Sequence, residues 1–176
     1  NGTLQAIPSK SQAHRLLICS AFADCETELI CRQTNRDIEA TVQCLNAIGA
    51  SIIKTNIGYV ISPIRKIPKK ATLNCGESGS TLRFMLPIVG ALGIDCLIHM
   101  EGRLPYRPLS TLWEEMERMG CMLSRPEEHI LHCCGKLLPG KYTIDGSVSS
   151  QFISGLLFAA ALIPGETKII ITGKTE

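Results

Sequence analysis

Basic, hydroxyl and small residues recur around the starts of three apolar segments in this 176-residue sequence. They are, in chain order, Lys10, Ser11 and Arg15, then Gly79 and Arg83, then Ser149, Ser150 and Gln151. Two more arginines, Arg103 and Arg107, precede a fourth segment that opens with Pro108. Ammonium, guanidinium and hydroxyl groups are good ligands for phosphate and carboxylate groups. The residue types therefore predict a binding site for such anions.

Three helices are expected directly behind these residues, over His14–Ala23, Leu82–Leu92 and Phe152–Ile163. A helix N-terminus presents unpaired N–H groups and a partial positive charge, which together attract anions. If the three helices run parallel, their starts open on one side of the molecule. Pro108 is a favoured residue for the first position of a fourth helix. A serine at a helix start is most often only an N-cap, so recurrence, not any single serine, supports a site.

The helix starts belong to an internal repeat of about seventy residues. Ser11, Ser80 and Ser149 are spaced by 69 and 69 residues, and two further helices, Asp37–Ile48 and Pro108–Met119, end at glycines 71 residues apart. Each of these second helices has one apolar stripe and is followed by a predicted hairpin, Ser51–Ile61 or Cys121–Cys133. The first helices are instead apolar all round, as in Leu16–Cys19 and Leu156–Ala160, which predicts burial on every side.

Each repeat is thus predicted to run strand, helix, strand, helix, hairpin, which gives an α/β (α+β) fold. We expect one domain over residues 1–176, with repeats at about 3–72, 73–141 and an incomplete 142–176. Three repeats would arrange pseudo-threefold around buried parallel helices. The third stops soon after Ile169–Ile171, and the sequence lacks an initiator Met, so we expect a fragment.

Composition narrows the class of protein. Apolar residues make up 45% and charged residues 19%, which is enough for a sizeable core. The net charge of +2 gives no footprint for nucleic acid. No apolar stretch is long enough for a membrane span, and we expect no signal peptide. The nine cysteines, an odd number scattered through apolar segments, favour free thiols in a cytoplasmic protein.

Other catalytic and metal motifs are weak. Gly76–Thr81 lacks the Gly-Lys-Ser/Thr step of a Walker phosphate loop. His129, His132, Cys133 and Cys134 crowd onto one predicted strand and alternate between its faces, so no metal site is expected. The histidines also show no Ser/His/Asp pattern.

Four motifs together carry a resemblance to one enzyme family. They are Pro8-Ser9-Lys10-Ser11 with Arg15, Gly79-Ser80-Thr81 with Arg83, Arg107-Pro108, and Asp145-Gly146-Ser147-Val148-Ser149-Ser150-Gln151-Phe152. In their order and spacing, along essentially the whole chain, they resemble the 5-enolpyruvylshikimate-3-phosphate synthases. The resemblance implies the enolpyruvyl transferase fold, with two domains of three repeats each. It also implies transfer of the enolpyruvyl group of phosphoenolpyruvate to shikimate 3-phosphate, towards aromatic amino acids, with no metal or organic cofactor and with glyphosate as inhibitor.

The resemblance also implies roles for individual residues. Lys10 would contact both substrates and stabilise the departing phosphate. Shikimate 3-phosphate would be held by Lys10, Ser11, Arg15, Ser149, Ser150 and Gln151. Phosphoenolpyruvate would be held by Lys10, Gly79 and Arg107, with Arg83 and Arg103 as supports.

Three departures accompany the resemblance. Glu77 stands where many relatives have Asn and would add negative charge beside the anion site. Pro87 lies inside the second central helix and should kink it or remove a hydrogen bond. The family's second domain, which supplies acid/base groups, is absent from the sequence. We therefore expect weak binding of shikimate 3-phosphate and no turnover by this chain alone.

Two alternatives remain open from the sequence. UDP-N-acetylglucosamine enolpyruvyl transferase has the same fold, although its typical Lys-Asn pair and loop cysteine do not match the motifs here. A non-catalytic module that senses a phosphorylated metabolite would use the same helix starts.

Overall fold

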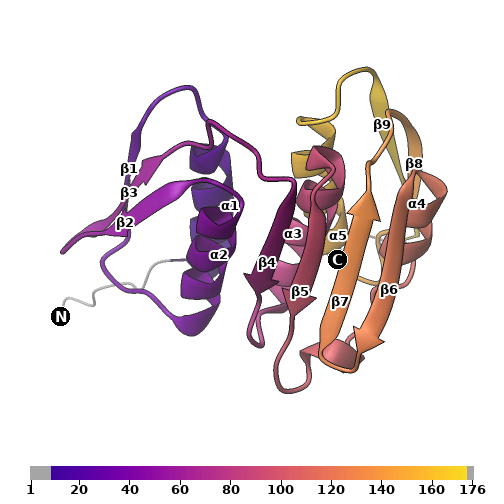
Figure 1. Ribbon diagram of the computed structural model, residues 1–176, viewed down its shortest axis with the longest axis horizontal. Coiled ribbons are helices and arrows are strands. Elements are labelled where there is room, and N and C mark those ends of the chain that lie inside the picture. Colours follow the sequence, from indigo (N-terminus) through magenta and orange to yellow (C-terminus); the bar gives the residue numbers. More distant parts are fainter. Residues whose placement is uncertain (1–8, 174–176) are drawn as a thin grey trace, which may run out of the picture.

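The computed structural model describes residues 9–173 and has helices packed against three separate sheets (Figure 1). The three central helices are α1 (Lys10–Ala21), α3 (Gly79–Leu92) and α5 (Ser150–Ala160). Each begins two to four residues earlier than expected, so Lys10 and Ser11, Gly79, and Ser150 and Gln151 lie within the first turns instead of ahead of them. The second helices are α2 (Arg36–Ala47), within one residue of expectation, and α4 (Leu112–Arg118).

The sheets repeat one pattern of strand order. The first sheet, ordered β1-β3-β2, contains β1 (Thr27–Ile30), β2 (Ser51–Lys54) and β3 (Gly58–Ser62). The second, ordered β4-β5-β7-β6, contains β4 (Lys70–Asn74), β5 (Asp95–His99), β6 (Cys121–Glu127) and β7 (Ile130–Gly135). In both, the strand after the central helix pairs antiparallel with the second strand of the following hairpin. The predicted hairpins are therefore confirmed.

Parallel strand pairs flank α3 and α5. β4 pairs parallel with β5 across α3, and β8 (Gly140–Asp145) pairs parallel with β9 (Thr167–Thr172) across α5. The order from β4 to β7 is the predicted strand, helix, strand, helix, hairpin. The corresponding opening strand of the first repeat would fall in residues 1–8, outside the described residues. The repeat boundaries stay a prediction.

The core centres on α3, which α5 and α2 contact directly (Figure 1). Nearly every residue of α3 is buried, as its all-apolar sequence predicts. The same expectation is wrong for the other two central helices. Leu16 of α1 is 42% exposed and Leu157 of α5 is 58% exposed. Only one side of each of these helices packs against neighbours among residues 9–173, so their outer apolar residues face outward.

Helix α3 runs unbroken through Pro87, and α5 approaches it closely at this point. Pro87 has no N–H to donate to the carbonyl oxygen of Arg83, four residues earlier. Gly155 of α5 lies against that carbonyl, and a Cβ built on Gly155 would overlap it and come 2.9 Å from Pro87 Cγ. The glycine therefore permits close packing at the place where α3 has lost a hydrogen bond.

Replacing Gly155 with alanine tests this contact. The new methyl group meets backbone that cannot rotate away, so we expect Gly155→Ala to lower the free energy of unfolding by about 1–3 kcal/mol despite its better helix propensity. Urea unfolding followed by circular dichroism measures the change. Leu157→Ala, an exposed position on the same helix, is the control and should shift stability by less than about 0.5 kcal/mol. Equal effects at the two positions would contradict the close-packing interpretation.

Candidate functional site

Serine N-caps hold the starts of the three central helices. The side-chain oxygens of Ser9, Ser78 and Ser149 accept hydrogen bonds from the backbone N–H groups of Gln12, Thr81 and Gln151, at 3.3, 3.3 and 3.2 Å. The equivalent caps are thus spaced by 69 and 71 residues. The predicted equivalence of Ser149 with Ser11 and Ser80 is wrong by two positions, because Ser149 is itself the N-cap, whereas Ser11 and Ser80 each follow their N-cap by two residues. In this structure the Ser149 side chain therefore acts as the N-cap of α5.

At the start of α1, Lys10 is the first helical residue and is exposed. Its Nζ lies 2.7 Å from the carboxylate of Asp37, which sits in the first turn of α2. Sequence reasoning missed Asp37, since nothing local links two residues that are 27 positions apart. The ion pair is half exposed, so solvent and a competing anion both have access to the ammonium group.

Arg15 links α1 to α5. Its Nη1 donates to Ser11 Oγ at 2.5 Å and to the Ser11 carbonyl at 2.8 Å, while Nη2 donates to Ser154 Oγ at 2.9 Å. The guanidinium carbon lies 5.2 Å from the centre of the Phe84 ring on α3. Stacking on an aromatic face holds the guanidinium plane without neutralising its charge. Arg15 and Ser11 therefore lie together, as the sequence predicted.

At the start of α3, Gly79 lies against two arginines. A Cβ on Gly79 would come 2.8 Å from Arg107 Nη1 and 3.7 Å from Arg83 Nη1, which brings the predicted trio together. Burial, and after it the charge of Arg107, lower the pKa of the Arg83 guanidinium. Within residues 9–173 neither arginine forms an ion pair with a carboxylate. Two neighbouring guanidiniums without a counter-charge attract an anion.

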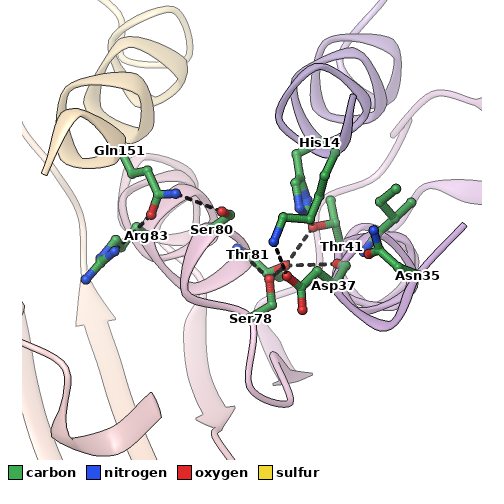
Figure 2. A network of polar contacts seen from close by, with 11 residues as sticks. His14, Asn35, Asp37, Thr41, Ser78, Ser80, Thr81, Arg83 and Gln151 are labelled. Atoms are coloured by element: carbon green, nitrogen blue, oxygen red, sulfur yellow. Dashed lines mark hydrogen bonds and ion pairs between the residues drawn. The ribbon is translucent and has the colours of Figure 1, made fainter. Parts of the chain in front are cut away.

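At the start of α5, the amide of Gln151 connects α5 to α3 (Figure 2). Gln151 Oε1 accepts from Arg83 Nη1 at 2.9 Å, and Gln151 Nε2 donates to Ser80 Oγ at 2.8 Å. The Arg83 guanidinium also lies over the Phe152 ring, 5.3 Å from its centre. Ser150 is the first residue of α5 and is exposed. The structure thus links the predicted residues of the second and third helix starts.

The segment that carries Arg103 and Arg107 differs from expectation. Leu104–Tyr106 forms a short 3-10 helix, η1, with Arg103 and Arg107 at its two ends. Helix α4 begins only at Leu112, so the prediction that Pro108 opens this helix is wrong. Thr111, which precedes α4, has φ 64°, a value that interrupts a helix and is rare for a β-branched residue. Both arginines are exposed.

Within residues 9–173, Glu77 forms no ion pair with Arg83 or Arg107. Its carboxylate packs over Gly102 and lines a cleft of about 490 Å³ together with Asp37, Glu39 and Glu101. The expected negative charge beside the arginines is therefore directed to the other side of the α3 start. This acidic cleft and the basic cluster occupy neighbouring but separate surfaces.

The histidines and cysteines form no metal centre among residues 9–173. His132 Nε2 lies 2.7 Å from the Asp95 carboxylate, and His129 Nδ1 lies 3.2 Å from the Met100 carbonyl. The nine cysteines are free thiols, six of them buried. No helix in the described part of the chain is long and apolar enough to cross a membrane.

Comparisons with known proteins point to one enzyme family. The sequence profile of EPSP synthase (3-phosphoshikimate 1-carboxyvinyltransferase) matches residues 1–175. The 3-phosphoshikimate 1-carboxyvinyltransferase of Clostridium beijerinckii is 35% identical over all of this chain, and that of Clostridioides difficile is 36% identical. The chain covers 42% and 43% of these two relatives.

A solved structure shows the same fold. The EPSP synthase of Acinetobacter baumannii superposes with a TM-score of 0.83 at 24% identity, over 99% of this chain and 41% of the other. The chain therefore spans less than half the length of the relatives it matches, roughly their N-terminal half. The profile match over nearly every residue, together with these relatives, places this chain in the EPSP synthase family.

Proposed function

We propose that this chain is the shikimate 3-phosphate-binding half of a cytoplasmic 3-phosphoshikimate 1-carboxyvinyltransferase. The intact enzyme would transfer the enolpyruvyl group of phosphoenolpyruvate to the 5-hydroxyl of shikimate 3-phosphate and release phosphate. The observation that carries this proposal is the pair of guanidiniums, Arg83 and Arg107, that lie at the Gly79 helix start without a carboxylate partner within residues 9–173. Family membership supports it.

The α1 and α5 starts would bind shikimate 3-phosphate. Ser11, Ser150 and Lys10 are exposed, and Arg15 reaches across from α1 to α5, so phosphate oxygens can be bound by residues of both helices. Ser149 and Gln151 are already bonded within the protein, but an amide nitrogen has two N–H groups and Gln151 uses one. Gln151 thus keeps a donor for a substrate hydroxyl while Arg83 fixes its orientation.

The α3 start would bind phosphoenolpyruvate. Arg107 can bind a carboxylate or phosphate through two parallel N–H groups, and Gly79 leaves room for it beside the helix start. Arg83 would add positive charge next to Arg107. Arg103 lies at the N-terminal end of η1, and Arg107 lies at its C-terminal end. Both anionic substrates would then meet at Lys10.

Lys10 would act on the phosphate that leaves the tetrahedral adduct. Attack of the 5-hydroxyl oxygen on the phosphate-bearing carbon of phosphoenolpyruvate, with loss of the hydroxyl proton and addition of a proton to the methylene carbon, forms this adduct. Expulsion of phosphate with loss of a proton from the resulting methyl group restores the double bond. An ammonium group near a helix N-terminus stabilises the charge that develops on the leaving phosphate and can donate a proton to it. Lys10 must exchange its Asp37 contact for the substrate, which the exposure of this ion pair allows. The remaining part of the enzyme would supply the acid/base groups for the 5-hydroxyl.

Lysine and arginine substitutions test the shikimate 3-phosphate site. Lys10→Ala and Arg15→Ala each remove a charged donor, worth about 1.5–3 kcal/mol, so we expect the dissociation constant to rise at least about tenfold. Isothermal titration calorimetry or NMR titration of the chain measures it. Lys54→Ala is the matched control, because Lys54 also forms a 2.7 Å ion pair with a carboxylate of α2, Glu39. Tighter binding of UDP-N-acetylglucosamine than of shikimate 3-phosphate would contradict the proposal.

Gly79→Ala tests the phosphoenolpyruvate site. The added methyl group would displace the flexible end of Arg107, so we expect a rise of about tenfold in the dissociation constant for phosphoenolpyruvate and a stability change under about 1 kcal/mol. Binding of shikimate 3-phosphate should change less than twofold, by about 0.4 kcal/mol or less. NMR titration of the same sample with each ligand gives both values. A parallel loss for both ligands would argue against separate subsites.

Turnover tests the division of labour. With both substrates present, we expect the chain alone to release no phosphate above the uncatalysed background, because the family's acid/base groups lie outside these residues. A coupled phosphate assay measures the release, with the intact two-domain enzyme of a relative as the positive control. Phosphate release at an ordinary enzymatic rate by this chain would refute the proposed half-enzyme.

A further inference from the structure

A fully buried histidine lies beneath the first helix start. His14 is 0% exposed, although Lys10 and Arg15 on the same helix reach the surface. Its Nδ1 lies 2.7 Å from Thr41 Oγ1 of α2, and that oxygen lies 2.8 Å from Thr81 Oγ1 of α3 (Figure 2). All three side chains are 0% exposed, so no solvent competes for these bonds. A buried chain of hydrogen bonds thus joins α1, α2 and α3.

Thr81 is the branch point of this chain. Its hydroxyl also lies 2.8 Å from Ser78 Oγ, the N-cap of α3, and 3.2 Å from the main-chain carbonyl of Asp37. A hydroxyl has one proton to donate and two lone pairs that accept. The Thr81 hydroxyl donates toward both Ser78 Oγ and the Asp37 carbonyl, which can only accept. Its single proton is engaged by these two acceptors, so Thr81 accepts from Thr41.

The direction of these hydrogen bonds determines which ring nitrogen of His14 carries the hydrogen. The Thr41 hydroxyl donates its only proton to Thr81. It must therefore accept from His14, so Nδ1 must carry the hydrogen. This arrangement keeps every contact of the Thr81 hydroxyl, whereas the reverse direction, in which Thr81 donates to Thr41, leaves Ser78 Oγ and the Asp37 carbonyl without the Thr81 proton. His14 Nε2 is then an unprotonated acceptor, and it is the ring nitrogen that is buried without a partner in the described structure.

A neutral ring fits this environment. Burial lowers the pKa of His14 to about 4, a larger influence than the opposing charge of Asp37. The Lys10 and Arg15 charges act in the same direction as burial. Near neutral pH the ring therefore has a single N–H, which the hydrogen-bond chain assigns to Nδ1.

These hydrogen bonds end on two residues, one of which pairs with a proposed substrate ligand and the other of which directly precedes one. Asp37, whose carbonyl accepts from Thr81, holds Lys10 with its carboxylate at 2.7 Å. Ser78, whose Oγ accepts from the Thr81 hydroxyl, directly precedes Gly79. We propose that His14, as the Nδ1–H tautomer, acts with Thr41 and Thr81 as a set of positioning residues that hold the Lys10–Asp37 pair against the α3 start. The substrate side of this inference rests on the proposed function.

The tautomer can be measured without any ligand. Long-range 1H–15N NMR of the wild-type chain distinguishes Nδ1–H from Nε2–H rings, and His14→Asn identifies the His14 signal among the four histidines. We expect a neutral Nδ1–H ring at pH 7. A protonated ring or an Nε2–H tautomer would overturn the assigned direction of the chain, whether or not the protein binds substrate.

Substitutions that keep shape test the positioning role. Thr41→Val removes the hydroxyl in a side chain of nearly the same shape, and we expect it to weaken shikimate 3-phosphate binding about tenfold. His14→Asn keeps an N–H near the position of Nδ1 and omits the unpartnered nitrogen, so affinity should stay within about twofold of wild type. His14→Leu keeps neither and should resemble Thr41→Val. Thermal unfolding of each variant shows which samples are folded at the titration temperature.

A double-mutant cycle with Lys10 separates positioning from general damage. If the hydrogen bonds from His14 to Thr81 act through Lys10, Thr41→Val should weaken shikimate 3-phosphate binding less than twofold in the Lys10→Ala background. The group to be positioned is then absent. An undiminished tenfold loss in that background, or a loss in His14→Asn equal to that in His14→Leu, would overturn the proposal. If the wild-type protein binds no shikimate 3-phosphate at millimolar concentration, the proposed function fails, and the substrate side of this inference fails with it. The tautomer measurement still decides the direction of the hydrogen bonds from His14 to Thr81.

Discussion

The close packing of α5 on α3 at Gly155 is the constraint on which the rest of the site depends. Because Gly155 has no side chain, α5 comes near enough for Gln151 to reach both Arg83 and Ser80. A wider helix spacing would break both bonds. The same spacing lets Arg15 of α1 reach α5 over the Phe84 ring. Close backbone packing at Gly155, one helical turn beyond Gln151, thus sets the distances among the polar groups at the helix starts.

Charge distribution, not net charge, distinguishes this surface. The overall charge is only +2, yet Arg83 and Arg107 lie together at a helix N-terminus, each without a carboxylate partner within residues 9–173. The rings of Phe84 and Phe152 stack against the guanidiniums of Arg15 and Arg83, respectively, which orders these groups and leaves their charge uncancelled. The Glu77 carboxylate lies on the other side of the α3 start, in the acidic cleft, whereas Asp37 of the same cleft pairs with Lys10. The field at the helix starts therefore favours anions.

The family assignment and the geometry address different questions. The profile match establishes common descent over nearly the whole chain, but relatives are more than twice its length. The described residues supply positive charge and hydrogen-bond donors at three helix starts. We propose that the general base for the substrate hydroxyl lies outside them, so that these residues form half of a site. Lys10 is paired with Asp37 in this structure, and under this proposal a substrate anion would take the place of Asp37.

The sequence by itself determined the helices, the hairpins and the concentration of basic residues near helix starts. These features follow from local patterns: apolar periodicity, serine caps and short spacings such as Ser11 to Arg15. Only the tertiary structure decided the partners. Arg83 bonds Gln151 across 68 positions, and Arg15 bonds Ser154 across 139, because helix packing selects which distant side chains meet. It also decided that α1 and α5 have exposed apolar faces and that α4 starts late. No local pattern encodes those outcomes, since burial depends on which neighbours cover a surface.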